Sequence, residues 1–486
     1  MPMTSSPAKA LWTAQDAATA MGAPLLGNAG WQAHGISIDT RTLQPGDLFF
    51  ALLGDGNDGH DYVAQALDKG AACAVISRPV DGLMPDAPLV QVDDTLKALE
   101  KLGLAARARS SARICAVTGS VGKTGTKEGL LHILSGQGRT HASVASYNNH
   151  IGVPITLARM PADAQYGIFE IGMNHANEIS PLVKMVRPEA VIITTVEAVH
   201  IENFGSVEEI ADAKAEIFDG LQAGGTAILN QDNPHFDRLR SRALACGAGK
   251  IIAFGKSELA DARVTRLSLQ SDASYVTASI CDHEMTYKLG VPGEHIVMNS
   301  LAMLACVHEL GADLALAGLA LGKLLPPEGR GSRIEIDVPR GSFLIIDESY
   351  NANPTSMRAV MQALGNTPPG PHGRRIAVVG DMLELGDQGP ADHAGLAAPI
   401  AENEIDLVFA CGPLMENLWD ALPTGVRGAY ADTSAELAAR VADEIAPGDV
   451  VMIKGSLGSR MAVVLKALKD LGPETQSNKN TKEELV

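Results

Sequence analysis

The chain has 486 residues and a net charge of −18, and 46% of its residues are hydrophobic but only 4% aromatic. Its length predicts about three domains, and its apolar content excludes a largely disordered chain. Because the charge is strongly negative, nonspecific binding to nucleic acid or to an acidic membrane is disfavoured. The chain has no apolar run of membrane-spanning length, no signal-like segment and no Cys-x-x-Cys, so we expect a cytoplasmic protein with buried free thiols.

The first segment, residues 1–109, has short strand-like runs at 48–52 and 74–76 and an amphipathic stretch at 62–69. Two polar turns, at 35–41 and 54–60, lie around them. Their composition alone favours ordinary loops. We expect a small N-terminal α/β domain here.

The second segment, residues 110–333, opens with Thr118-Gly119-Ser120-Val121-Gly122-Lys123-Thr124, between an apolar run at 114–117 and a helix-like stretch at 127–134. A strand, a glycine-rich turn, Lys-Thr and a helix form the layout of a phosphate-binding loop. Lys123 would contact the β- and γ-phosphates, and the Thr124 hydroxyl would bind Mg²⁺. The usual motif has a glycine where this chain has Val117, so the loop is a variant. The layout favours nucleotide binding over a surface turn but does not specify the reaction.

Continuous apolar runs alternate with helical stretches through the rest of the chain. In the second segment the runs predict a mostly parallel sheet covered on both faces, with an antiparallel addition at 262–288 and a helix at 299–310. Polar residues end several runs, and ligands bind outside the carboxyl ends of such strands. The third segment, 334–473, repeats this rhythm and resembles a Rossmann-like domain without the G-x-G-x-x-G motif. Residues 474–486 are polar, and we expect a disordered tail.

One carboxylate of the second segment could bind a metal. Glu170 ends an apolar strand, where a carboxylate is costly to bury without a cation, so it is either a Mg²⁺ ligand or an ordinary cap or surface residue. His200 and Lys214 follow it, and a lysine on an amphipathic helix is usually a solvated charge. Each residue alone therefore carries little weight.

Taken in order, the motifs resemble the Mur ligase family, the ATP-dependent amide-bond-forming enzymes of peptidoglycan synthesis. The resemblance spans the chain except its tail and rests on these segments: 118–124, 170–174, His200 with 203–206, 213–218, 229–232, 293–302 and 329–330. The stretches 347–354, 379–386 and 453–456 resemble one branch, which joins D-alanyl-D-alanine to UDP-N-acetylmuramoyl-tripeptide. The resemblance implies that these two molecules and ATP are the substrates.

The resemblance also implies roles for individual residues. The ATP site would be Thr118, Gly119, Ser120, Val121, Gly122, Lys123, Thr124, Asn299, Arg330 and Asp347. Thr124 and Glu170 would hold one Mg²⁺, and Glu170, His200 and Lys214 a second. Because an ammonium cannot ligate a metal, Lys214 would be carbamylated, as the matching lysine is in the family. The catalytic residues would be Lys123, His200 and Lys214.

Substrate contacts are implied in two further regions. Ser37, Asp39, Thr40, Asn57 and His60 would face the uridine nucleotide. The residues beside the reaction centre and the dipeptide would be Asn149, Tyr350, Asn351, Asn353 and Lys454. The chain departs from common family residues at Gly125, Thr195, Ile296 and Glu348, and none of these changes removes a proposed catalytic group.

The implied reaction is carboxylate activation by ATP through an acyl phosphate, followed by attack of the dipeptide amine. Another amide ligase of the superfamily, or a nucleotide-driven switch without a synthetic step, is the alternative. Nothing in the sequence demands more than a monomer, and we expect the third domain to close on the other two near Arg333.

Overall fold

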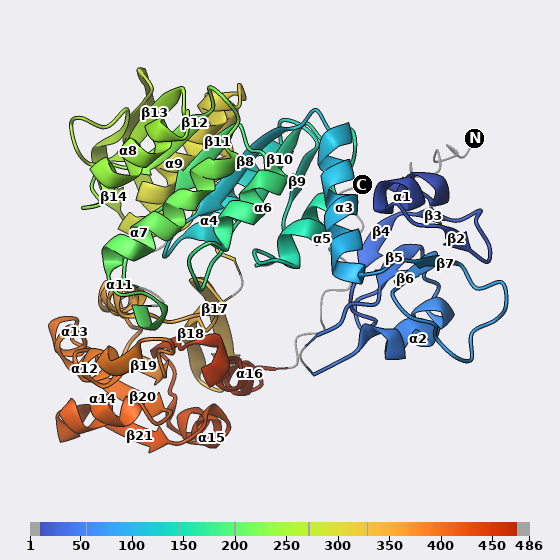
Figure 1. The fold of residues 1–486 in the computed structure, drawn as a ribbon. Coiled ribbons are helices and arrows are strands. Elements are labelled where there is room, and N and C mark those ends of the chain that lie inside the picture. The colour runs from blue at the N-terminus through green and yellow to red at the C-terminus, as the bar shows by residue number, and fades with distance from the viewer. Residues whose placement is uncertain are drawn as a thin grey trace, which may run out of the picture.

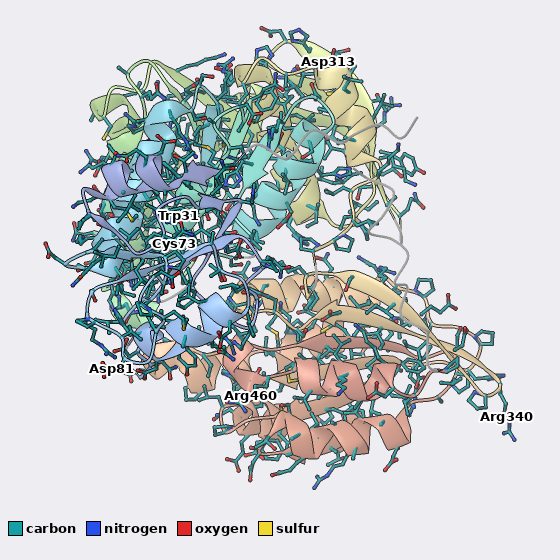
Figure 2. All side chains as sticks on the ribbon, turned by 90° about the vertical axis from the view of Figure 1, so that its right-hand side faces the viewer. Trp31, Cys73, Asp81, Asp313, Arg340 and Arg460 are labelled. Carbon is teal, nitrogen blue, oxygen red and sulfur yellow. The ribbon has the colours of Figure 1, made fainter. Side chains whose placement is uncertain are left out.

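The computed structural model describes residues 10–54, 56–144, 146–198, 201–270, 273–327 and 329–473. The expected metal ligand His200 and the expected tail at 474–486 lie outside these residues. The described strands form three α/β units along the chain, which confirms the predicted fold class (Figure 1). In Figure 2, Asp313 lies at one extremity of the molecule and Arg340 at the tip of a hairpin at another.

The N-terminal unit is a five-stranded sheet with a small two-stranded ribbon beside it. The sheet has four parallel strands and one antiparallel edge, in the order β2 (Leu25–Leu26), β7 (Leu89–Gln91), β6 (Cys73–Ile76), β5 (Asp47–Phe50) and β4 (Gly35–Ser37). The remaining elements are β1 (Trp12–Thr13), β3 (Gln32–Ala33), α1 (Ala14–Met21), η1 (Gly59–Tyr62), α2 (Val63–Asp68) and α3 (Thr95–Arg109). These strands are short, so the sequence predicted only β5 and β6.

The central unit is a nine-stranded sheet in which the three strands that come last in the sequence pair antiparallel with one another, as predicted for 262–288. Its order is β16 (His283–Leu289), β15 (Ser274–Ile280), β14 (Ala262–Leu269), β13 (Lys250–Gly255), β12 (Thr226–Asn230), β11 (Ala190–Ile193), β8 (Arg113–Thr118), β10 (Tyr166–Glu170) and β9 (Thr140–Ala142). Alternate residues of β8 enter opposite cores, Cys115 and Val117 on one face and Ile114 and Ala116 on the other. The sheet is therefore buried on both faces, as expected for continuous apolar runs.

Helices cover both faces of this sheet. One core contains residues of α4 (Lys123–Ser135), α9 (Glu294–Glu309) and α10 (Leu314–Leu321). The other contains residues of α5 (Gly152–Ala158), α6 (Ile179–Val186), α7 (Val207–Ala215), η3 (Glu216–Gly220) and α8 (Phe236–Ala245). Helix α4 begins at Lys123, four residues before the stretch that the sequence predicted. The lysine of the phosphate loop is thus the first residue of the helix.

The C-terminal unit is a six-stranded sheet, parallel except for its first strand. Its order is β17 (Ser332–Val338), β18 (Gly341–Glu348), β22 (Val450–Lys454), β19 (Arg375–Gly380), β20 (Leu407–Cys411) and β21 (Arg427–Ala431). Its helices are α11 (Pro354–Gly365), α12 (Gly389–Ala394), α13 (Ala397–Glu402), α14 (Met415–Ala421), α15 (Ser434–Glu444) and α16 (Ala462–Lys469). Its short 3-10 turns are η4 (Gly386–Gln388), η5 (Thr424–Val426) and η6 (Leu457–Ser459), and the central unit has one more, η2 (Ile201–Asn203). In Figure 1 this sheet lies below the central one.

The N-terminal and central units share a core, because Ile155 and Ala158 of α5 pack among the apolar side chains of the N-terminal sheet. Helix α3 packs along α5. No described helix is long and apolar enough to cross a membrane. The parallel strands of each sheet place their carboxyl ends on one edge of that sheet. The site described next lies at these edges of the central and C-terminal sheets.

Candidate active site

The phosphate loop lies between β8 and α4 and faces a cavity of about 550 Å³. Residues 120–125 line this cavity. Lys123 donates from Nζ to the carbonyls of Gly119, at 2.7 Å, and Ser120, at 3.4 Å, so its side chain folds back over the loop. Burial lowers the pKa of Lys123, an effect that Glu170 opposes and Arg330 reinforces. The backbone N–H groups, the helix start and the lysine together can hold a polyphosphate.

Two glycines of the loop have positive φ angles and close neighbours. Gly119 has φ +149° and lies against Thr194, whose Oγ1 donates to Val121 O at 2.6 Å. Gly122 has φ +88°, and a Cβ there would lie 2.6 Å from Nδ2 of Asn299. Asn299 therefore packs on the phosphate loop itself. The predicted residue Thr118 is fully buried and does not line the cavity.

Thr124 and Glu170 line the cavity together. Oε1 of Glu170 accepts a hydrogen bond from Nδ2 of Asn148 at 2.7 Å, while Oε2 is buried without a hydrogen-bond partner among the described residues. An unpaired buried carboxylate oxygen is costly unless a cation compensates it. This oxygen and the Thr124 hydroxyl suit a hard cation such as Mg²⁺, which prefers oxygen ligands.

Lys214 lies in the last turn of α7 and is 3% exposed, without lining the cavity. Burial, with a smaller effect of Lys123, holds its pKa well below the usual value. No group of three or more His, Cys, Asp or Glu side chains suited to a metal occurs among the described residues. A complete metal site would therefore need further ligands, such as Thr124, a modified Lys214 or His200. Of these, His200 lies outside the described residues.

The wall of the cavity next to Asn299 is apolar. It is lined by Val291, Ile296, Met298, Met303, Leu324, Leu325, Pro326 and Pro327. Such a surface beside a phosphate loop suits the flat face of a nucleobase. Asn299 itself is only 9% exposed, and its amide is the polar group at this end.

The opposite wall is formed by the C-terminal unit and by Arg330, which lies just before its first strand. Arg330 lies over the ring of Tyr350, 4.2 Å from its centroid, and both line the cavity with Asn351, Asn353 and Lys454. Lys454 donates from Nζ to Asn351 O at 2.7 Å and lies 3.7 Å from Oε2 of Glu348. Burial raises the pKa of Glu348 and lowers that of Lys454. The cavity thus has two cations, Arg330 of the central unit and Lys454 of the C-terminal unit, around one half-buried carboxylate.

Three residues predicted to bind ATP or substrate form hydrogen bonds with the protein backbone in this structure. Asp347 is 1% exposed and does not line the cavity; its carboxylate accepts from the backbone N–H groups of Gly329, at 3.2 Å, and Ser349, at 3.1 Å. Asn149 accepts from the N–H groups of Ile151 and Gly152 and so begins α5. Asn353 both lines the cavity and caps α11.

The residues expected to face a uridine nucleotide lie at the carboxyl edge of the N-terminal sheet and do not line the cavity. Ser37 ends β4, Asp39 pairs with the exposed Arg41, and Thr40 donates to Gln65 at 2.9 Å. Asn57 is exposed. This edge therefore forms a second region, separate from the cavity.

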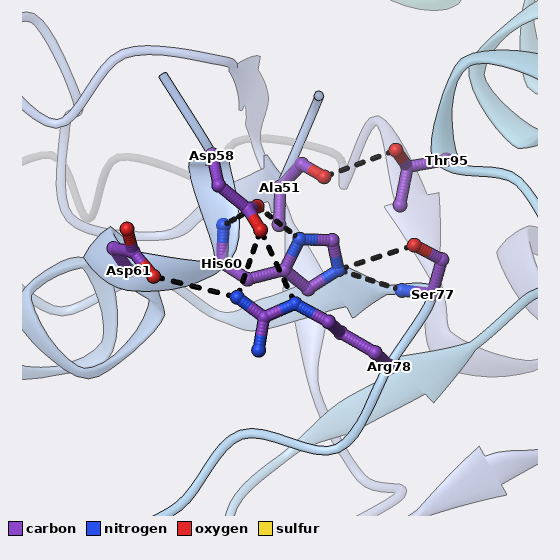
Figure 3. Close-up of polar contacts among 7 residues, drawn as sticks. All are labelled: Ala51, Asp58, His60, Asp61, Ser77, Arg78 and Thr95. Atoms are coloured by element: carbon purple, nitrogen blue, oxygen red, sulfur yellow. Dashed lines mark hydrogen bonds and ion pairs between the residues drawn. The ribbon is translucent and has the colours of Figure 1, made fainter. Parts of the chain in front are cut away.

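His60 is 1% exposed, and both of its ring nitrogens have partners (Figure 3). Nδ1 lies 2.6 Å from Oδ1 of Asp58, and Nε2 accepts the backbone N–H of Ser77 at 2.9 Å. Arg78 pairs with the other oxygen of Asp58 at 2.8 Å. His60 cannot offer a ring nitrogen to a ligand; it joins the loops that follow β5 and β6.

Sequence reasoning missed two cavity residues with clear roles. Asn148 holds Glu170, and Glu348 is the half-buried partner of the buried Lys454. Nothing in the sequence distinguishes Asn148 from its neighbour Asn149. The position of Glu348 beside Asp347 at the end of an apolar strand was the signal available for that residue.

The chain matches three profiles of one family along its length. They are the Mur ligase family, catalytic domain, at residues 32–108; the Mur ligase middle domain at 117–307; and the Mur ligase, glutamate ligase domain at 332–457. Similar proteins include the UDP-N-acetylmuramoyl-tripeptide–D-alanyl-D-alanine ligases of Escherichia coli and Rickettsia prowazekii. They are 37% and 31% identical, covering 90% and 93% of this chain and 94% and 98% of the relatives.

Two solved structures have the same fold over most of the chain. The MurF protein of Acinetobacter baumannii superposes with a TM-score of 0.82 at 30% identity, covering 96% of this chain and all of that one. The MurF ligase of Thermotoga maritima in complex with ADP superposes with a TM-score of 0.74 at 25% identity, covering 90% and 97%.

Proposed function

The chain belongs to the Mur ligase family of ATP-dependent ligases, and we propose that it adds D-alanyl-D-alanine to UDP-N-acetylmuramoyl-tripeptide. The observation that carries the proposal is the cavity, which is lined both by the phosphate loop with Glu170 and by Arg330, Tyr350 and Lys454. An enzyme that activates a carboxylate with ATP and then delivers an amine needs these two walls around one space.

In the proposed reaction a tripeptide carboxylate oxygen attacks the γ-phosphorus of ATP, which releases ADP and gives an acyl phosphate. The dipeptide amine then attacks the acyl carbon, and the tetrahedral intermediate expels phosphate, loses a proton and leaves an amide. Lys123 contributes positive charge where the phosphoryl group is transferred. Arg330 and Lys454 would orient anionic groups from the opposite wall. Holding both reactants in one cavity removes much of the entropic barrier.

We propose that Thr124 and Glu170 hold one Mg²⁺ and that Glu170, His200 and a carbamylated Lys214 hold another. The unpaired Oε2 of Glu170 supports the first site. Lys214 is buried and its pKa is low, so its amine is available to react with carbon dioxide. When bound, the ions would neutralise charge on the phosphates and polarise the transferred group.

We propose that Ser37, Asp39, Thr40 and Asn57 contact the uridine nucleotide at the edge of the N-terminal sheet. His60 would position the loops at this edge, and Asp347 would position the loops beside the cavity. The proposed domains are residues 1–109, 110–333 and 334–473, although β17 of the third sheet begins at Ser332. Because residues from two domains line the reaction cavity, we propose that the third domain closes when the substrates bind, and that a monomer suffices.

A phosphate-release assay tests the function. Purified protein with ATP, UDP-N-acetylmuramoyl-tripeptide and D-alanyl-D-alanine should release phosphate only when all three are present. Glutamate in place of the dipeptide should give none, which separates this ligase from other amide ligases of the superfamily. Phosphate release that ignores the dipeptide would contradict the proposal and indicate a nucleotide-driven switch.

A further inference from the structure

Helix α5 connects the two regions that the proposed substrate must reach. All seven of its residues are buried. It begins beside Glu170 of the cavity and ends beside β4 of the N-terminal sheet. At about 1.5 Å per residue the helix is about 10 Å long, so it is a short rigid spacer between these regions.

The start of α5 is fixed to the cavity. Asn149 accepts hydrogen bonds from the N–H groups of Ile151 and Gly152, at 3.2 and 2.9 Å. The preceding residue, Asn148, holds Glu170 and accepts the N–H of Gly172 at 2.9 Å. A displacement of this end of the helix would therefore move the carboxylate of the proposed metal site.

The other end is fixed to the N-terminal sheet by Arg159, the residue that follows α5. Its Nε donates to Ile36 O at 2.8 Å, and its Nη2 donates to the same oxygen. Ile36 lies in β4, which is the edge strand of its sheet, so this carbonyl accepts from the central domain instead of from another strand. Ser37, the next residue, is the first of the residues proposed to contact the uridine nucleotide. We call that part of the N-terminal sheet the uridine edge.

Arg159 is half-buried and poorly compensated for a cation in that position. Burial lowers its pKa, and the nearby Tyr147 and Asp47 oppose that effect only in part. No salt bridge is formed by Arg159 within the described parts of the chain. A half-buried charge held by one carbonyl is weak evidence of a stabilising role. Its geometric effect is clear, because two donors on one oxygen fix the direction as well as the distance of the contact.

Neighbouring contacts keep the same interface close. Trp12 donates from Nε1 to Ala158 O at 2.9 Å. Gly103 of α3 allows close approach, since a Cβ there would lie 3.0 Å from Pro154 O. The two domains therefore meet along α5 without room for sliding.

We propose that Arg159 is a positioning residue that sets the spacing between the uridine edge and the phosphate loop. This inference rests on the proposed function, because a substrate held at its nucleotide end in one domain and at its carboxylate in another requires that spacing. Arg159 does not line the cavity, and its guanidinium bonds to the backbone of β4. Its loss should misplace the carboxylate while each domain keeps its own fold.

The test compares Arg159→Met, Arg159→Lys and the control Arg139→Met, which removes an exposed arginine paired with Asp163 on the same domain. A misplacement of about 1 Å can cost about 100-fold, so Arg159→Met should lower kcat/KM for UDP-N-acetylmuramoyl-tripeptide by about 10- to 100-fold. Lysine can restore one donor, and Arg159→Lys should recover part of the loss. The affinity for Mg·ADP, measured by calorimetry, should change by less than about twofold in all three variants.

Hydrogen exchange supplies a readout that does not depend on turnover. In Arg159→Met the amides of residues 36–40 should exchange faster, whereas those of 118–124 should not change. Wild-type kcat/KM in Arg159→Met, or an equal loss of Mg·ADP binding, would overturn the inference. If the wild-type protein made no amide bond, the proposed function would fail, and the exchange data would still decide whether Arg159 holds β4.

Discussion

Asn148 donates a hydrogen bond of 2.7 Å from Nδ2 to Oε1 of Glu170 and leaves Oε2 of that carboxylate without a partner among the described residues. The amide of Asn148 therefore orients the carboxylate of Glu170 and leaves its second oxygen available to a metal ion. Partners of this kind typically change metal affinity or activity by about 10- to 100-fold when removed. We predict that Asn148→Ala raises the Mg²⁺ concentration for half-maximal activity by about that factor, measured by magnesium titration of phosphate release.

The adjacent Asn149→Ala is the matched control. Asn149 bonds to the start of α5, so its loss should cost about 1 kcal/mol of stability, as at other helix caps. Its melting temperature should fall, and its Mg²⁺ requirement should change much less than that of Asn148→Ala. Equal shifts in Mg²⁺ requirement for the two variants would show that Asn148 acts only through the fold of this loop.

The sequence predicted the part of the site that depends on chain direction and periodicity. A continuous apolar run must end at the edge of a buried sheet, so the sequence alone predicts that Lys123 and Glu170 lie at one edge. It could not show where a side chain points once the loops pack. The segments predicted to bind substrates do contain the polar residues Asn149, His60 and Asp347. Each of these side chains, however, accepts a hydrogen bond from a backbone N–H group of the protein.

The same limit applies to the fold. Long Val/Ile runs predicted the central strands of the second and third sheets. The two-residue strands β1, β2 and β3 leave no periodic signal, and β17 is the edge strand that pairs with β18. Such strands are specified by tertiary pairing more than by local preference.

Two glycines at the phosphate loop should respond in opposite ways to substitution. Gly122 has φ +88° and lies against Asn299, so Gly122→Ala should strain the loop and displace that side chain. We predict a loss of Mg·ADP affinity of about tenfold or more, measured by calorimetry, since strain of this kind costs about 1–3 kcal/mol.

Gly125 provides the comparison, because it lies inside α4 and a Cβ there would meet nothing within 4 Å. Alanine is a better helix former than glycine by about 1 kcal/mol, so Gly125→Ala should raise the melting temperature. Its Mg·ADP affinity should remain near that of the wild type. A loss of affinity as large as that of Gly122→Ala would show that the phosphates pass closer to α4 than the loop geometry indicates.

His60→Asn tests whether the buried imidazole positions the uridine edge. Asparagine keeps a donor toward Asp58 but is too short to accept the Ser77 N–H, and an unsatisfied buried donor costs about 1–3 kcal/mol. We predict a lower melting temperature and a higher KM for UDP-N-acetylmuramoyl-tripeptide, with the KM for ATP unchanged, in steady-state assays.

Asp61→Asn is the control for that variant, since Asp61 is exposed and contacts Arg78 only at 3.4 Å. It should match the wild type in both KM values. A melting temperature that falls in His60→Asn while every KM stays constant would assign His60 to stability alone.

Lys214→Ala tests the proposed carbamate. The lysine is buried with a pKa held well below its usual value, first by burial and then by Lys123. Metal-ion stabilisation contributes several kcal/mol, so losing a ligand should lower kcat on the order of 100-fold or more. Added short-chain carboxylic acids should restore part of the activity by supplying the missing oxygens, whereas the exposed Lys184→Ala should need no rescue. Full activity of Lys214→Ala without added acid would contradict the carbamate, because a ligand that is not required cannot hold the second metal.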